Sequence, residues 1–292
     1  MLRISIICIA VFWSWSGIGQ EKTPFATYDF SSDKAYLEKR SALEKESNTT
    51  PQYNALIRLA TEYKDFETAI RYYAKSIEIE PDNVELHYRL AGVNGIRIDE
   101  ISKFKALPYV YAMKTNFLKA HQLDPTHTPT LTALVRIYAK LPDFLGGSLD
   151  KANNFAKLLF DLSPIEGLLA QGFISESEDK PIQAEAQYKS AFELLPFLDD
   201  GCENSSVNSY FENRSQNLSY EIASIGLAYN LSSLASICAL QYYVAQFDVY
   251  DNLPKEWAYY KLALLYEKIN EKDQAIQYHS LALEINPTFN PE

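Results

Sequence analysis

The clearest pattern of apolar and polar positions lies near the C-terminal end of the chain. Tyr259, Leu262, Ala263 and Tyr266 stand at i, i+3, i+4 and i+7, which places them on one face of a helix. A second helical period runs over residues 274–285, and the proline at 287 stops it because proline cannot continue a helix. The pattern therefore predicts two amphipathic helices that pack as a hairpin.

The same register of large and small apolar residues recurs upstream. Three segments repeat parts of it without a gap, and they carry Phe66, Ala69, Ile70, Tyr73, Ile77 and Pro81; Gly172, Ala184, Tyr188, Ala191 and Pro196; and Ile222, Ile225, Gly226, Tyr229, Cys238, Tyr242 and Ala245. Residues 90–125 and 131–164 carry it with insertions, about ten and about five residues longer than the period. The extra residues fall at 92–108 and 141–148, and the sequence does not say what they do.

The spacing of the small residues has a packing reason. Small side chains at three fixed positions let the two helices of a hairpin approach closely, and large ones fill the gaps between hairpins. This pattern over residues 51–287 resembles the tetratricopeptide repeat, and the insertions, one of them with Gly146, Gly147 and Ser148, resemble those of exported bacterial members with long first turns. The resemblance implies an all-α, right-handed α-solenoid of about six hairpins, preceded by a capping helix.

The first residues predict a signal peptide. Arg3 precedes an apolar run of roughly a dozen residues, and Gly17 and Gly19 occupy the small-residue positions of a cleavage site after Gly19. The run is shorter than the roughly 20 residues that a spanning helix needs, although an uncleaved anchor is the alternative. We therefore expect an exported protein, periplasmic or otherwise extracytoplasmic, with no transmembrane segment after cleavage.

The remaining boundaries follow from the repeat. Residues 20–50 form an extension, with residues 20–32 extended and a capping helix from Asp33 to Glu46 that Asp33 caps. The expected order is then repeats 1–4 at 51–196, a loop at 197–217 that is mobile or functional, and repeats 5–6 at 218–292.

The formal charge of −11 disfavours nucleic acid as a partner, because an acidic surface repels phosphate backbones. The charge suits a basic or neutral peptide, but it is also a common means of staying soluble. Two cysteines remain after cleavage, Cys202 and Cys238. An oxidising compartment permits a disulfide between them, yet Cys238 also falls where the repeat places a small packing residue, so the pairing stays open.

No motif for catalysis, cofactor binding or metal binding stands out. His121 and His127 are six residues apart across a proline turn, which is not a zinc-ligand spacing on one helix face, and His279 takes an aromatic packing position. The glycines at 146 and 147 lack the Lys and Ser or Thr of a phosphate-binding loop, so we expect a chain reversal in which Ser148 caps the next helix. We expect no enzyme, no cofactor and no metal.

The resemblance also implies where a partner binds. In the family, the first helix of each repeat lines a concave groove that holds peptides, and the groove-facing positions correspond here to Arg58, Tyr88, Arg136, Lys140, Phe173, Glu176, Asn230, Trp257, Tyr260 and Glu267. Tyr88, Phe173 and Tyr260 have an alternative role in packing between hairpins. Arg136 and Lys140, four apart on one helix, share a face that either holds a carboxylate or is simply solvated.

Three functions remain open. The first is an exported, non-catalytic scaffold or adaptor that binds a peptide or protein in its groove. The second is a structural subunit of a cell-envelope complex that uses the convex face or the 197–217 loop. The third is an enzyme or a small-ligand binder. An exposed apolar patch in the groove favours the first, and one on the convex face favours the second. The partner, the pathway and the oligomeric state are not predicted.

Overall fold

The computed structural model describes residues 30–46, 48–198, 202, 205–212, 214–251 and 253–291. Within these ranges the chain is helical and contains no strand. The predicted signal peptide at 1–19 and residues 20–29 lie outside the described residues. The elements are η1 (Phe30–Ser32), α1 (Lys34–Glu44), α2 (Thr50–Glu62), α3 (Phe66–Ile79), α4 (Val84–Glu100), α5 (Lys103–Leu123), α6 (Thr128–Lys140), η2 (Asp143–Leu145), α7 (Leu149–Leu162), α8 (Pro164–Ser177), α9 (Pro181–Glu193), α10 (Ser205–Phe211), α11 (Gln216–Ala228), α12 (Ser233–Gln246), α13 (Lys255–Lys268) and α14 (Lys272–Ile285).

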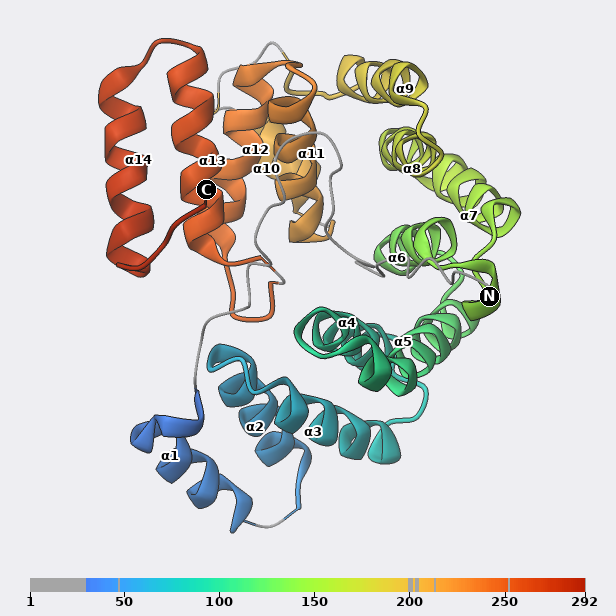
Figure 1. Ribbon diagram of the computed structural model, residues 1–292, viewed down its shortest axis with the longest axis vertical. Helices are drawn as coiled ribbons and strands as arrows, with labels where there is room; N and C mark the ends of the chain where they lie inside the picture. Colours follow the sequence, from blue (N-terminus) through green and yellow to red (C-terminus); the bar gives the residue numbers. More distant parts are fainter. Residues whose placement is uncertain are drawn as a thin grey trace, which may run out of the picture. The chain divides into compact units, whose positions relative to one another are not determined.

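The helices form hairpins that pack on their sequence neighbours, as in an α-solenoid (Figure 1). The chain divides into two compact units, Met1–Phe155 and Ala156–Glu292, which we call unit 1 and unit 2. In unit 1 each helix from α1 to α5 packs against the next, and α5 packs against α6. In unit 2 the packed pairs are α8 with α9, α11 with α12, α12 with α13 and α13 with α14. Such consecutive packing confirms the predicted all-helical fold of hairpins.

The capping helix α1 is held by a buried polar contact. Asp33 caps it, as the sequence predicts, by accepting a hydrogen bond from the backbone N–H of Tyr36 at 3.0 Å. The fully buried Tyr36 donates its hydroxyl to Asp65, and Arg40 donates to the same carboxylate at 3.0 Å. The other oxygen of Asp65 accepts from the N–H of Thr68 and caps α3. One carboxylate thus joins α1 to the first hairpin.

Four hairpins turn in the same way after their first helix. Lys64, Asp179, Asn230 and Asn270 each adopt a left-handed conformation one residue beyond the helix C-cap. The next residue then donates its N–H to a carbonyl in the last turn of the helix, as Asp65 does to Ala60 at 2.8 Å. This is the Schellman arrangement, which satisfies carbonyls that a helix end leaves unpaired.

The small residues of the repeat lie where the helices approach most closely. A Cβ built on Gly172 of α8 would overlap the ring of Tyr188 on α9, and one built on Gly226 of α11 would overlap the hydroxyl of Ser236 on α12. Because neither neighbour leaves space for a methyl group, glycine at these positions follows from the close packing of each hairpin.

The family resemblance implied a long turn at the insertion in the second repeat, and the structure shows none there. The insertion lengthens the helices instead, so that α4 has 17 residues and α5 has 21, whereas the second helix of the first repeat has 14. The added turns bury Ile98 and Ala106, and Arg97 forms an ion pair of 2.9 Å with Glu67 on α3. These apolar and charged contacts explain why the added residues are helical.

The insertion at 141–148 forms a compact reversal around η2. Gly146 is left-handed with φ of 82°, and the hydroxyl of Ser148 accepts from the N–H of Lys151 at 3.3 Å, as expected of a cap on α7. Phe155 of α7 stacks on Tyr138 of α6 with ring centroids 5.7 Å apart, which closes the third hairpin.

The segment predicted as a loop at 197–217 contains the short helix α10. Its apolar residues Val207, Tyr210 and Phe211 are buried, and Phe211 packs on Tyr242 of α12 with centroids 5.0 Å apart. The polar neighbours predicted a loop, but apolar residues at i, i+3 and i+4 form a face that packs on α12, which explains the helix. Residues Phe30–Ser32, expected to be extended, form the 3-10 turn η1.

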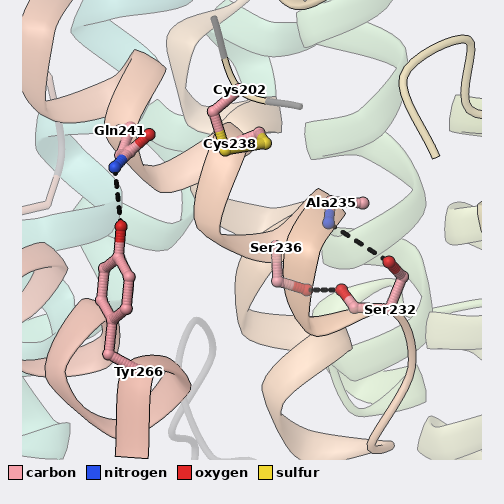
Figure 2. Close-up of a disulfide and its surroundings, with 7 residues drawn as sticks. All are labelled: Cys202, Ser232, Ala235, Ser236, Cys238, Gln241 and Tyr266. Carbon is pink, nitrogen blue, oxygen red and sulfur yellow. Dashed lines mark hydrogen bonds between the residues drawn. A yellow bond between two sulfur atoms is a disulfide. The ribbon is translucent and has the colours of Figure 1, made fainter. Parts of the chain in front are cut away.

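A disulfide between Cys202 and Cys238 resolves the pairing that the sequence left open (Figure 2). Cys238 lies on α12 and is 1% exposed, so it fills the small packing position and bonds covalently at the same time. On the same helix, the hydroxyl of Ser232 accepts from the N–H of Ala235 at 3.2 Å. Gln241 donates to the hydroxyl of Tyr266 on α13 at 2.9 Å. The bond therefore attaches the segment before α10 to a helix that is itself anchored to its neighbour.

Candidate partner-binding surface

The predicted groove residues lie on the first helices of the hairpins, with one exception. Unit 1 carries Arg58 on α2, Tyr88 on α4, and Arg136 and Lys140 on α6. Unit 2 carries Phe173 and Glu176 on α8, and Trp257, Tyr260 and Glu267 on α13. Asn230 lies in the turn after α11, where its backbone is left-handed and its amide oxygen accepts from Lys268 at 3.2 Å.

In unit 1, Tyr88 contributes to the contact between neighbouring hairpins. Its half-buried ring meets Phe117 edge to face at 5.7 Å and His127 at 5.2 Å, and His127 begins the next hairpin. Burial lowers the pKa of His127, which favours the neutral ring. The packing alternative for Tyr88 therefore has structural support.

Arg58, Arg136 and Lys140 are the cationic residues among the predicted groove positions of unit 1. Arg58 is exposed on α2, and the other two are half-buried on α6. Their spacing of four residues places Arg136 and Lys140 on one face of that helix. Side chains four residues apart on a helix are neighbours, so one carboxylate can accept charge-assisted hydrogen bonds from both.

In unit 2, Glu176 links two hairpins. Its carboxylate accepts a hydrogen bond of 2.5 Å from the hydroxyl of Tyr229, which lies at the end of α11 and packs on Tyr188. Burial, reinforced by this carboxylate, raises the pKa of Tyr229 well above its usual range. Phe173 lies one turn away from Glu176 on the same helix and is half-buried.

Trp257 does not line an open surface, in contrast to its predicted place in the groove. It is buried on α13, and its ring meets Phe289 edge to face at 5.1 Å. Tyr260 is half-buried beside the same phenylalanine at 5.9 Å, because the segment after α14 folds back over α13. Glu267 is exposed and accepts from His279 at 3.2 Å. Only the last of these three residues presents its side chain mainly to solvent.

Large apolar side chains are distributed unequally between the two helices of each hairpin. Among the described residues, none that is exposed lies on a first helix, whether α2, α4, α6, α8, α11 or α13. The exposed ones lie on second helices such as α5, α7 and α14, in turns, and in the 141–148 insertion, where Phe144 is 80% exposed. The first helices therefore present polar and half-buried aromatic groups.

Sequence reasoning missed the exposed apolar residues of α5 and the insertion. Leu107, Tyr111 and Leu118 lie on one face of α5, but the sequence alone does not distinguish an outer apolar stripe from one that packs on a neighbour. Within the described part of the chain, no group of three or more His, Cys, Asp and Glu side chains is arranged to hold a metal ion. There, too, no helix is long and apolar enough to cross a membrane.

Comparison with known families agrees with the first and last hairpins. Residues 55–83 and residues 256–289 each match a family model of the tetratricopeptide repeat. These two segments are therefore similar to the tetratricopeptide repeat. Repeats of this kind generally mediate protein–protein interaction and scaffolding, and the family is typically non-catalytic. No curated protein matches the chain.

Proposed function

We propose that this tetratricopeptide-repeat protein is an exported, non-catalytic scaffold that binds a protein or peptide along the first helices of its hairpins. The observation that carries the proposal is the character of those helices. They expose no large apolar side chain in the described residues, and first helices of different hairpins carry cations and half-buried aromatic rings. Such a surface suits an extended polar peptide better than an apolar one.

Arg136 and Lys140 are the strongest candidates for direct contact. They share one face of α6, and a peptide carboxylate there would accept charge-assisted hydrogen bonds from both. Tyr88, Glu176 and Trp257 also hold hairpins or the C-terminal segment together, so substitution of any of them would disturb packing as well as binding.

Two observations support export. The apolar N-terminal run with small residues before Gln20 has the form of a cleavable leader. The bond between Cys202 and Cys238 suits an oxidising compartment, since cytosolic reductants keep thiols reduced. Expression of the full chain followed by cell fractionation and N-terminal sequencing tests this part. We expect extracytoplasmic protein that begins at Gln20, and a cytoplasmic, uncleaved product would contradict export.

The binding proposal is tested by crosslinking and pull-down from the native envelope fraction with the Arg136→Ala/Lys140→Ala variant. We expect the wild type to capture a partner that this variant loses. The matched control is Lys157→Ala/Lys189→Ala, which removes the same charge from exposed positions on α7 and α9. Equal capture by wild type and both variants, with folding checked by circular dichroism, would contradict binding along the first helices.

A second function, a structural subunit that uses the opposite side of the hairpins, has one observation in its favour. The exposed large apolar side chains in the described ranges lie on second helices, in turns and in the 141–148 insertion. Retention of the partner by the Arg136→Ala/Lys140→Ala variant would favour this function.

A further inference from the structure

The two insertions that interrupt the repeat pattern meet in unit 1. The first lengthens α5 to 21 residues, and the second forms the reversal at 141–148. Lys114 of α5 joins them, because its ammonium group donates to the carbonyl oxygens of Leu145 at 3.4 Å and Gly146 at 3.2 Å. Burial and the neighbouring Lys151 lower the pKa of Lys114. The two insertions, which are separate in the sequence, are thus in direct contact in the structure.

The reversal at 141–148 is held in a defined shape. The N–H groups of Leu145, Gly146 and Gly147 bond to carbonyls of Pro142 and Asp143, and the N–H of Ser148 bonds to Tyr138 at 2.8 Å. Leu145 is buried beneath the turn. The preceding residue, Phe144, is nevertheless 80% exposed, so a fixed backbone presents a large aromatic ring to solvent.

An apolar stripe on α5 lies on either side of the residue that anchors this turn. Leu107, Tyr111 and Leu118 are all exposed, Tyr111 by 56%, and their spacing places them on the same helix face as Lys114. From residue 107 to 118 the helix rises about 16 Å. We call Leu107, Tyr111, Leu118 and Phe144 the insertion surface. Exposed apolar groups gathered in this way mark interaction sites more often than scattered ones do.

The charge of α5 sets this surface apart from the rest of an acidic chain. The helix contains four lysines and no Asp or Glu, although the protein has a net charge of −11. The second helices α3, α7, α9 and α14 each carry both signs, and α12 carries none. Lys105 is exposed near the start of the stripe, and Lys119 near its end lies 3.7 Å from Asp82.

We propose that the insertion surface is a docking site for an acidic protein segment that carries apolar side chains. The rings of Phe144 and Tyr111 anchor the segment, and the exposed Lys105 attracts its carboxylates. The rigid turn favours binding because Phe144 needs no reordering. The insertion surface shares no residue with the candidates on the first helices, so we propose it as a second binding site. An anionic membrane fits less well, because the net charge of −11 repels it beyond this helix.

The test selects peptides that bind the mature chain from a displayed library of random 12-residue peptides. A counter-selection on the Phe144→Ala/Tyr111→Ala variant removes peptides that bind elsewhere on the protein. We expect enriched peptides to combine Asp or Glu with Leu, Phe or Tyr. By fluorescence anisotropy, a synthetic enriched peptide should bind Phe144→Ala about tenfold more weakly. Lys105→Glu should weaken binding by about threefold, with a steeper effect at low salt.

The matched control is Ile182→Ala on α9 in unit 2, where the side chain is 82% exposed; this change also removes exposed apolar area, and it should leave binding unchanged. Failure to enrich any peptide, or enriched peptides that bind the double variant as tightly as the wild type, would overturn the proposal. Vesicles with and without phosphatidylglycerol form the second arm. Binding to the anionic vesicles that Phe144→Ala abolishes would assign the surface to a membrane instead. The Arg136→Ala/Lys140→Ala variant should keep its affinity for the peptide, which separates this test from that of the first helices.

Discussion

The segment that contains α10 and the reversal at 141–148 both lie outside the regular hairpins, and they present their aromatic rings in opposite ways. In unit 2, the segment that contains α10 buries Phe197 and Phe211 and is bonded covalently to α12 through Cys202. In unit 1, the reversal at 141–148 is held by hydrogen bonds and by the buried Leu145, with no covalent link, and it leaves Phe144 exposed. The segment that contains α10 adds to the core of unit 2, whereas the ordered backbone at 141–148 holds a ring that is mostly exposed to solvent.

This difference implies that the α10 segment contributes to folding stability and that the reversal at 141–148 contributes to partner binding. A buried aromatic ring contributes several kcal/mol to folding, whereas an exposed one contributes little unless a partner covers it. The segment of α10 should therefore be sensitive to substitution in stability measurements. The reversal at 141–148 should be sensitive in binding measurements.

The largest effect should come from Phe211→Ala. Phe211 is 1% exposed and packs on Phe197, Tyr210 and Tyr242, so its loss leaves a cavity that costs about 3–5 kcal/mol. Urea unfolding followed by circular dichroism measures this change. The same substitution at Phe144 is the control and should cost less than about 0.5 kcal/mol. Equal costs at the two positions would refute the contrast.

Removal of the disulfide should have the next largest effect. The Cys202→Ala/Cys238→Ala variant frees a loop with a sequence separation of 36 residues, and the lost constraint on the unfolded chain costs about 4 kcal/mol. Hydrogen exchange should increase in α10 and α12, while α2 and α3 of unit 1 stay protected, because solenoid stability depends on nearest neighbours. Uniform deprotection of both units would contradict this local effect.

A smaller effect is expected from Gly147→Ala. The added methyl group would overlap the carbonyl oxygen of Leu141, so the reversal must shift at a cost of about 2 kcal/mol. Thermal unfolding measures the loss, and binding of a peptide selected on the insertion surface should weaken because Phe144 is re-aimed. Gly92→Ala on α4 is the matched control, since its added methyl group meets no atom within 4 Å. A Gly147→Ala protein as stable as that control would argue against a rigid turn.

The hairpins were predictable because their spacing reflects local packing. Gly172 and Gly226 mark where two helices approach, and this signal is visible in sequence since a larger residue would collide. Likewise, Asp33 precedes the capping helix in a position that only a short polar acceptor fills well.

The features that differ from the sequence-based prediction depend on contacts between residues far apart in the chain, which the sequence does not reveal. Trp257 occupies a groove position in the repeat pattern, but Phe289 covers it from a segment that the pattern ignores. The polar composition around residue 205 predicted a loop, yet packing on α12 stabilises a helix there. The candidate residues on α6 stay predictions, since their role depends on a partner.

The disulfide has a mechanical consequence. It closes a ring of chain between Cys202 and Cys238, and tension applied at the two ends of the protein passes across the bond instead of along the enclosed residues. α10, α11 and the start of α12 are therefore shielded from load. When the chain is pulled fully straight, the oxidised form is shorter than the reduced form by about 120 Å, the contour length of the ring.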